Sequence, residues 1–237
     1  MKKILRFIQK KVFPQKDIII PQEFENEDDY YTFFFTKHPK WSQPEPNKAE
    51  LARLAEIEKM MQLISDKKRD KTIDIIDFGC GRGWLANKLA KYGKVFGIEP
   101  VENVVNYAKK LYPNISFETG SIEKLLNKRV DLIVASEVIE HFESEDKLKY
   151  FNAFNAVLNS NGYCLITTPR AEVQEEWLSY REDAGQPVEN WLTEKQVNEL
   201  AVLSGFEVVE KVILKERAND PNSPLLDLYQ IWLFKKI

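Results

Sequence analysis

The chain has 237 residues, of which 43% are hydrophobic, so it is long enough for one sizeable domain with additions. Its 34 basic and 37 acidic residues give a net charge of -3, which provides no general attraction to nucleic acid or to an anionic membrane. No apolar run approaches the ~18 residues of a membrane-spanning helix, and two cysteines make no disulfide framework. We therefore expect a cytoplasmic location, with nucleic acid disfavoured as a partner.

The first thirteen residues combine apolar side chains with lysine and arginine. Charge interrupts the apolar positions, which disfavours a secretory signal peptide. Two interpretations stay open for residues 1–13. They form either a basic amphipathic helix that makes weak peripheral contact with a membrane, or a helix or partly ordered tail that belongs to the protein's own surface.

An aromatic segment follows, with seven aromatic side chains between Phe24 and Trp41. This content is too high for a disordered leader, so the segment must pack on something. We assign residues 1–48 to an N-terminal extension and residues 49–237 to the main domain. The extension either packs as a satellite cluster over the sheet or closes as a lid over an acceptor pocket.

Apolar residues at helical spacing between Leu51 and Ile64 predict a helix that ends in the charged run 67–71. The apolar run Ile73 to Phe78 then predicts a strand, which leads into a turn with three glycines and a second helical pattern from Leu85 to Ala90. Glycines in such a turn let a ligand approach main-chain groups that a Cβ atom would shield. The strand, turn and helix together indicate a nucleotide-like ligand.

The spacing of the glycines indicates which nucleotide binds. Gly79 and Gly81 fit a dinucleotide motif, but the third glycine of that motif would stand at position 84, where this chain has Trp84. An acidic residue, Glu99, lies 22 positions after Asp77 and ends a second predicted strand, from Val95 to Ile98. A carboxylate at that place suits a ribose, because it accepts hydrogen bonds from two neighbouring hydroxyl groups.

Strand and helix patterns alternate regularly after Glu99. The predicted helices and helical turns lie at 101–111, 121–126 and 148–158, and the predicted strands at 115–118, 130–135 and 163–168. Strands separated by helices of this length build a parallel sheet with right-handed crossovers. The pattern is typical of a doubly wound α/β domain.

The C-terminal part departs from this alternation. Thr193 and Gln196 form a predicted capping box for a helix that Gly205 ends. The segments 206–214 and 228–234 then predict two long strands that pair as an antiparallel hairpin. The predicted fold class is thus α/β, with a doubly wound seven-stranded sheet that is mostly parallel, an antiparallel C-terminal hairpin, and helices on both faces.

Several motifs resemble those of class I S-adenosylmethionine-dependent methyltransferases. The turn D-x-G-x-G-x-G with Glu99 resembles the cofactor motifs of this Rossmann-like family, while S-E-V-I-E-H-F at 136–142, T-T-P-R at 167–170 and residues 191–206 resemble the subgroup of ubiquinone-biosynthesis O-methyltransferases and small-RNA 2′-O-methyltransferases. The resemblance implies S-adenosyl-L-methionine as cofactor. The residues that it implies for binding the cofactor are Asp77, Gly79, Cys80, Gly81, Glu99, Pro100, Ser121, Ile122 and Ser136.

Within this set, the resemblance places Asp77 and the glycine turn at the methionine portion, and Glu99 with Pro100 at the ribose. The family commonly has an acid that holds the adenine where this chain has Ser121. A backbone contact at Ile122 does not depend on that side chain.

The candidate catalytic residues are His141, Glu137 and Glu140. Two carboxylates beside an imidazole could bind a divalent cation, but the RNA enzymes of the family need a further histidine downstream. This chain has only His38 and His141, so we expect no metal. His141 is either the general base for an acceptor hydroxyl or a structural residue of the loop, and we expect Glu137 and Glu140 to orient the substrate or the loop.

The sequence therefore predicts an S-adenosylmethionine-dependent methyltransferase that methylates an oxygen of a small hydroxylated molecule or a glycan. Residues 169–192 are expected to be an insertion that forms a wall of the acceptor pocket. Two alternatives stay open, an RNA 2′-O-methyltransferase and a protein that binds the cofactor without turnover. The lack of a basic stripe in the sequence disfavours RNA.

Overall fold

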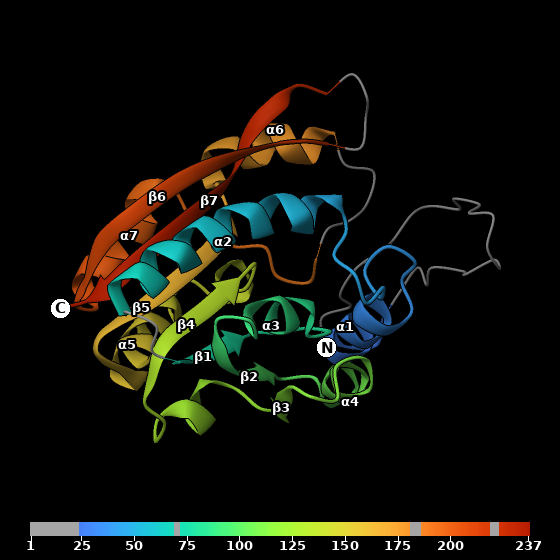
Figure 1. The fold of residues 1–237 in the computed structure, drawn as a ribbon. Helices are drawn as coiled ribbons and strands as arrows, with labels where there is room; N and C mark the ends of the chain where they lie inside the picture. The colour runs from blue at the N-terminus through green and yellow to red at the C-terminus, as the bar shows by residue number, and fades with distance from the viewer. Residues whose placement is uncertain (1–23, 69–71, 181–185, 219–222) are drawn as a thin grey trace.

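A seven-stranded sheet with strand order β3-β2-β1-β4-β5-β7-β6 forms the centre of the computed structural model (Figure 1). The structure describes residues 24–68, 72–180, 186–218 and 223–237, so the expectation for residues 1–13 lies outside the described part. Strands β3, β2, β1, β4 and β5 are parallel, and β7 lies antiparallel between β5 and β6. The predicted fold class is confirmed. The strands are β1 Ile73–Phe78, β2 Gly93–Glu99, β3 Ser116–Thr119, β4 Val130–Ser136, β5 Leu158–Pro169, β6 Phe206–Arg217 and β7 Leu225–Lys236.

The central strands β1 and β4 are buried on both faces, which explains why their sequences are almost continuously apolar. Ile75 of β1 pairs with Val95 of β2 on one side and with Leu132 of β4 on the other. Because neighbouring strands are parallel, their carboxyl ends meet at one edge of the sheet. That edge carries the glycine turn after β1, Glu99 at the end of β2 and the loop after β4.

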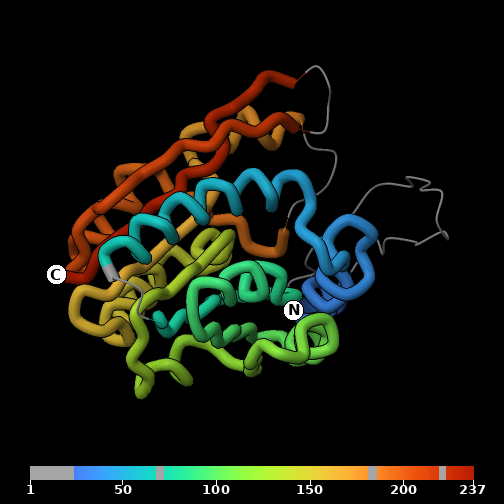
Figure 2. Tube along the Cα trace, viewed as in Figure 1, coloured from blue at the N-terminus to red at the C-terminus, as the bar shows by residue number. Residues whose placement is uncertain are grey.

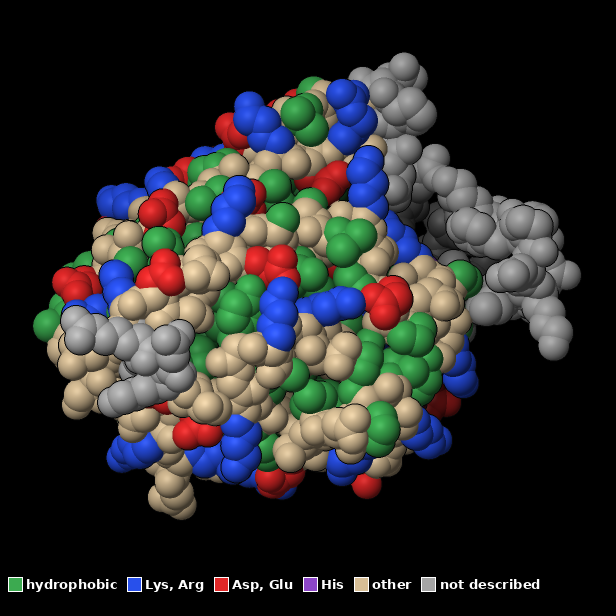
Figure 3. Space-filling model, in the orientation of Figure 1, with side chains coloured by type: hydrophobic (Ala, Val, Ile, Leu, Met, Phe, Trp, Pro, Cys, Tyr) green, Lys and Arg blue, Asp and Glu red, His purple; other side chains and the backbone are tan. Residues whose placement is uncertain are grey.

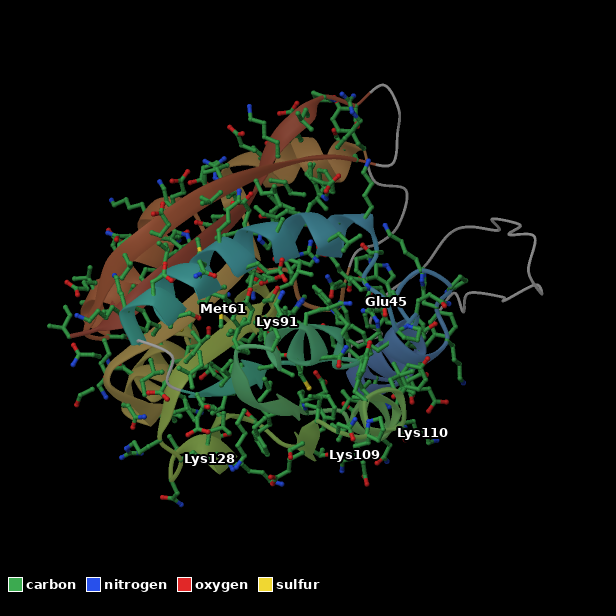
Figure 4. All side chains as sticks on the ribbon, in the orientation of Figure 1. Glu45, Met61, Lys91, Lys109, Lys110 and Lys128 are labelled. Carbon is green, nitrogen blue, oxygen red and sulfur yellow. The ribbon has the colours of Figure 1, made fainter. Side chains whose placement is uncertain are left out.

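Helices cover both faces of the sheet, and each face has its own hydrophobic core. Helices α2, α3 and α4 pack on one face, while α5, α7 and the short helix η1 (Ile122–Leu125) pack on the other (Figure 2). Met61 of α2 is fully buried against the first face (Figure 4). The helices are α1 Glu27–Thr36, α2 Lys48–Lys68, α3 Trp84–Leu89, α4 Glu102–Leu111, α5 Lys147–Val157, α6 Gln174–Ser179 and α7 Glu194–Leu203.

The C-terminal elements follow the sequence pattern closely, but some strands are longer. The capping box of α7 is present, because the Thr193 and Gln196 side chains each bind the other residue's backbone amide. Strand β5 begins five residues earlier than expected, since Leu158 pairs with Val130 ahead of the apolar run. Strand β6 continues to Arg217 because it pairs with β7 as far as Leu225.

The aromatic segment contains a helix that the sequence pattern did not predict. Asn26 caps α1 by accepting a hydrogen bond from the Asp29 amide at 2.9 Å. Aromatic rings then stack along the helix, with Tyr31 over Phe35 at 6.2 Å between ring centroids and Phe34 over Trp41 at 5.1 Å. No helix in the described ranges is long and apolar enough to cross a membrane.

Candidate functional site

A cavity of about 1740 Å³ lies at the carboxyl edge of the sheet. The glycine turn, the end of β2 and the loop after β4 form its floor. Helix α1, the start of α2, residues from the 169–191 segment and residues of β6 and β7 line other sides. This is the edge at which open parallel sheets bind their ligands. The structure thus brings the candidate catalytic residues and the sequence-predicted cofactor residues, with the exception of Ile122, to one cavity.

The turn after β1 requires glycine at three positions, of which Gly83 has a φ angle of 82° and a Cβ position 2.5 Å from Phe117. Gly79 and Gly81 have φ angles of 70° and 50°, which residues with side chains rarely adopt. A Cβ atom on Gly79 would lie 2.5 Å from Val138, and one on Gly81 would lie 3.0 Å from Phe35 of α1. Side chains at positions 79 and 81 would crowd the loop after β4 and helix α1, which lies directly beside the turn.

Glu99 is held with both carboxylate oxygens in defined positions. Its Oε2 accepts a hydrogen bond from the Gly81 amide and its Oε1 accepts one from the Val101 amide, each at 3.2 Å. The side chain is buried, and this burial raises the pKa of Glu99 to about 7 although the two amide bonds oppose the shift. Each oxygen keeps acceptor capacity for a hydroxyl group, as a ribose diol requires.

Asp77 provides a buried carboxylate oxygen that lacks a partner. Its side chain is only 2% exposed, and its Oδ2 accepts no hydrogen bond from the described residues. Burial raises the pKa of Asp77 to about 7. Buried polar atoms are rarely unsatisfied, so this oxygen suits a ligand that brings a donor such as an amino group.

The remaining cofactor candidates contribute in different ways. The Cys80 thiol packs in the core under the turn, and Ile122 is fully buried on the opposite face of the sheet, so only their backbones can reach a ligand. Pro100 and Ser121 line the cavity. The Ser136 hydroxyl also lines it, at 2.9 Å from the Thr167 hydroxyl.

The loop after β4 is fixed to β5 through Glu137. This residue has a φ angle of 58°, which costs a side-chain-bearing residue roughly 1 kcal/mol or more. Two hydrogen bonds stabilise it there, from the Glu137 amide to the Thr167 carbonyl at 2.9 Å and from the Thr167 hydroxyl to Glu137 Oε1 at 2.8 Å. Burial raises the pKa of Glu137 to about 7, while nearby Arg53 opposes the shift.

Glu140 and His141 are adjacent members of the short helix η2 (Ile139–His141). The Thr168 hydroxyl donates to Glu140 Oε2 at 3.0 Å, and burial raises the pKa of this carboxyl to about 7. His141 Nδ1 lies 2.7 Å from the Val188 carbonyl oxygen. A carbonyl can only accept, so Nδ1 carries the proton and Nε2 keeps its lone pair in the neutral ring.

The imidazole of His141 is suited to accept a proton. Burial lowers its pKa below the ordinary value, so the neutral form prevails at neutral pH. Nε2 lies 4.0 Å from Glu140 Oε1, and the ring meets Tyr31 of α1 edge to face at 6.0 Å. Among the residues that the structure describes, no group of three or more His, Cys, Asp or Glu side chains is placed to hold a metal ion.

Two buried arginines belong to this region, and the sequence interpretation did not identify either. Arg53 of α2 lines the cavity, and Arg82 in the glycine turn forms a buried ion pair with Glu50. The sequence pattern could have indicated them. Positions 50, 53, 57 and 64 lie on one face of the predicted helix, where Ile57 and Ile64 are apolar and buried but Glu50 and Arg53 are charged. Charged residues on a buried stripe indicate a polar site or a structural ion pair.

Comparison with known proteins places the chain in a family. Residues 46–211 match the Methyltransferase domain family. The chain belongs to this family. The resemblance predicted from the turn, Glu99 and the loop after β4 is thereby confirmed.

Individual relatives match parts of this methyltransferase chain. It is 33% identical over 117 residues to the mitochondrial ubiquinone biosynthesis O-methyltransferase of Rattus norvegicus. This match covers 45% of this chain and 32% of that protein. It is 29% identical over 124 residues to the malonyl-[acyl-carrier protein] O-methyltransferase of Halalkalibacterium halodurans, covering 46% of this chain and 45% of that protein. The matches span from 24% to 55% of the length of the first four curated relatives.

The fold is also similar to solved structures over most of the chain. The magnesium protoporphyrin IX methyltransferase of Synechocystis PCC 6803 with bound SAM superposes with a TM-score of 0.66 at 12% identity, covering 90% of this chain and 98% of that one. At this identity the likeness concerns the fold alone.

Proposed function

We propose that this methyltransferase domain binds S-adenosylmethionine and transfers its methyl group to an oxygen of a small hydroxylated molecule or a glycan. The observation that carries the proposal is the pair of buried carboxylates at the glycine turn. One carboxylate oxygen of Asp77 accepts no hydrogen bond in the described part of the chain, so it is available to an amino group of the ligand. The two oxygens of Glu99 are positioned for a ribose diol. The names of the O-methyltransferase relatives support the same class of reaction.

In this proposal, the cofactor supplies a methyl group on a positively charged sulfur, which is already a strong electrophile. The protein then has two tasks, to align the acceptor oxygen and to remove its proton. His141 Nε2 takes the proton of the acceptor hydroxyl, and Nδ1 stays bonded to the Val188 carbonyl, which holds the ring in the required tautomer. Glu137 and Glu140 orient this loop through Thr167 and Thr168.

The walls of the cavity support a small acceptor. Tyr31 of α1 faces His141, and Phe35 faces the glycine turn, so this helix closes one side of the cavity as a lid over the acceptor. Trp177 of α6 and Val188 line another side, which fits the role proposed for residues 169–192. On the face shown in Figure 3, basic and acidic side chains are interspersed without a continuous basic stripe, which does not favour RNA.

The decisive experiment combines cofactor binding with a product screen. Calorimetry is expected to show binding of S-adenosylhomocysteine and no binding of NAD. Mass spectrometry with isotope-labelled S-adenosylmethionine and a panel of hydroxylated acceptors is then expected to find a methyl group on an oxygen atom. Affinity for NAD without affinity for S-adenosylhomocysteine would refute the cofactor assignment, and labelled product on nitrogen or carbon alone would refute the assignment of the acceptor atom.

A further inference from the structure

Arg53 is a buried cation, and two of its three guanidinium nitrogens have no hydrogen-bond partner among the described residues. Arg53 is 4% exposed and lines the cavity. Its Nε and Nη1 atoms are the two nitrogens without a partner in the described part of the chain. Buried N–H groups of a charged side chain are costly to leave unpaired. A group that is absent from the free protein would satisfy them.

The surroundings of Arg53 hold the guanidinium in place without consuming its donors. The group lies over the ring of Tyr229 from β7, at 4.7 Å from the ring centroid. This contact fixes the plane of the guanidinium and leaves its edges available. Among charged groups, Glu137 contributes most to raising the pKa of Arg53, but one of its carboxylate oxygens already accepts a hydrogen bond from Thr167.

Arg82 shows how the same fold treats a buried arginine that is structural. Its two terminal nitrogens donate to Glu50 at 2.7 and 2.8 Å, and its Nε donates to the Gln43 carbonyl at 2.5 Å. Glu50 and Arg53 are only three positions apart on α2, so the two arginines share one region of the molecule. The two buried arginines therefore differ in that Arg82 donates to protein acceptors, whereas Nε and Nη1 of Arg53 remain available to a ligand in the cavity.

We propose that Arg53 binds an oxyanion of the methyl acceptor, a carboxylate or a phosphate group. The inference rests on the proposed methyl transfer and adds a substrate class to it. Arg53 lines the same cavity as His141, so an anion bound by Arg53 keeps the acceptor within reach of the loop after β4. Aromatic side chains dominate the neighbouring wall, among them Tyr31, Phe35 and Trp177, which favours an acceptor with an apolar or aromatic body.

The test uses matched probes that differ in charge. Benzoate, phenylphosphate and the neutral benzamide are titrated into the full-length protein saturated with S-adenosylhomocysteine, and binding is measured by calorimetry or by ligand-detected NMR. At least one anion is expected to bind about 10- to 100-fold more tightly than benzamide. Arg53→Met and Arg53→Gln are expected to abolish this preference, and Arg53→Lys to retain part of it.

A control variant separates a specific site from general attraction. Lys40 also lines the cavity, but it is exposed and lies over Trp41. Lys40→Met removes the same charge, and it is expected to leave the preference for the anion intact. Melting curves check that each Arg53 variant is folded, and Arg53→Gln serves as the test variant if Arg53→Met is not.

Each outcome bears on the inference. Benzamide binding as tightly as both anions, no anion binding at millimolar concentration, or a preference that survives in Arg53→Met would overturn it. Equal losses in Lys40→Met and Arg53→Met would also overturn it, because they indicate unspecific attraction. A preference for benzoate over phenylphosphate assigns a carboxylate, and the reverse assigns a phosphate. Loss of S-adenosylhomocysteine binding with the anion site intact would refute the proposed function and not the anion site.

Discussion

The guanidinium of Arg82 and the carboxylate of Glu50 form a bidentate ion pair that is almost completely withdrawn from solvent. Arg82 belongs to the glycine turn and Glu50 to the first turn of α2, so the pair joins the glycine turn to the helix that carries Arg53. Nε of Arg82 also donates to the Gln43 carbonyl. The position of the glycine turn therefore depends on a segment about 40 residues earlier in the chain.

Breaking this pair should destabilise the protein strongly. Arg82→Leu leaves the Glu50 carboxylate buried without its partner, and the expected loss of unfolding free energy is about 3 to 5 kcal/mol. Urea denaturation measures it. The exposed pair of Lys91 and Glu58 serves as control, and Lys91→Ala is expected to cost about 1 kcal/mol or less. Similar small losses in both variants would contradict a structural role for Arg82.

Two truncations separate the proposed lid function of α1 from any contribution of the N-terminal segment to the fold of the domain. Deletion of residues 1–41 removes α1 but keeps the carbonyl groups of Ser42, Gln43 and Glu45, which accept hydrogen bonds from Tyr107 and Arg82. This variant is expected to stay folded and to bind S-adenosylhomocysteine, but to lose methyl transfer.

Deletion of residues 1–47 also removes those three acceptors and the cap residue Asn47 of α2. Its melting temperature is expected to fall well below that of the shorter deletion. Full activity in the variant without residues 1–41 would show that α1 is not a lid, and equal melting temperatures of the two variants would show that residues 42–47 contribute nothing to the fold.

The sequence predicted those features that are encoded locally. The strand from Ile73 to Phe78, the glycine turn and Glu99 follow from the local sequence, because a strand buried on both faces is a nearly continuous apolar run and positive φ angles in a turn favour glycine. The helix α1 and the role of Arg53 could not be predicted in this way. Both depend on contacts between segments far apart in the chain, such as that between Arg53 and Tyr229, which no local pattern contains.

The buried carboxyl groups make a prediction about stability and pH. Asp77, Glu99, Glu137 and Glu140 all have a folded-state pKa of about 7, well above ordinary values. Between about pH 4 and pH 7 the folded state therefore binds more protons than the unfolded state. Its unfolding free energy should fall as the pH rises through this window. The lowered pKa of His141 makes the unfolding free energy rise with pH below about pH 6.5. This is the effect of one group, whereas four carboxyl groups act in the other direction.

Urea denaturation at several pH values between 5 and 8 measures this dependence. Asp77→Asn cannot titrate at this position, so its unfolding free energy should decline less with rising pH than that of the wild type. Glu145 is an exposed carboxylate, and Glu145→Gln should keep the wild-type slope. An unfolding free energy that increases from pH 5 to pH 7 would contradict the burial of these four groups as ionisable carboxyls.

Glu99 should control the affinity for the nucleoside portion of the cofactor. Glu99→Ala is expected to weaken binding of S-adenosylhomocysteine by about 1.5 to 3 kcal/mol, because charge-assisted hydrogen bonds are lost. In the wild type the affinity should decrease as the pH falls below about 7, where this carboxyl becomes protonated. Calorimetry measures both effects. Glu102 is an exposed carboxylate outside the cavity lining, so Glu102→Ala is the control, with an expected change of about 0.5 kcal/mol or less. An equal loss in both variants would exclude Glu99 as the ribose ligand.

His141 provides the test of the proposed chemistry. Its Nδ1 proton is committed to the Val188 carbonyl, so Nε2 is the only ring atom that can receive a proton from the acceptor. His141→Ala and His141→Gln should both lower kcat by ~10² to 10⁴ and leave the affinity for S-adenosylhomocysteine unchanged. In the wild type, kcat/KM should rise with pH through an inflection below the ordinary imidazole pKa, because burial favours the neutral ring.

The glutamine variant distinguishes a base from a structural residue. Its amide can donate to the Val188 carbonyl as the imidazole does, but it cannot accept a proton at neutral pH. His38→Gln is the matched control, since His38 lines the cavity and is the other histidine of the sequence. A rate near that of the wild type in His141→Gln, with the pH inflection retained, would leave alignment of the acceptor as the main source of the rate. A flat pH profile together with a low rate in His141→Gln, but not in His38→Gln, would establish the imidazole as the base.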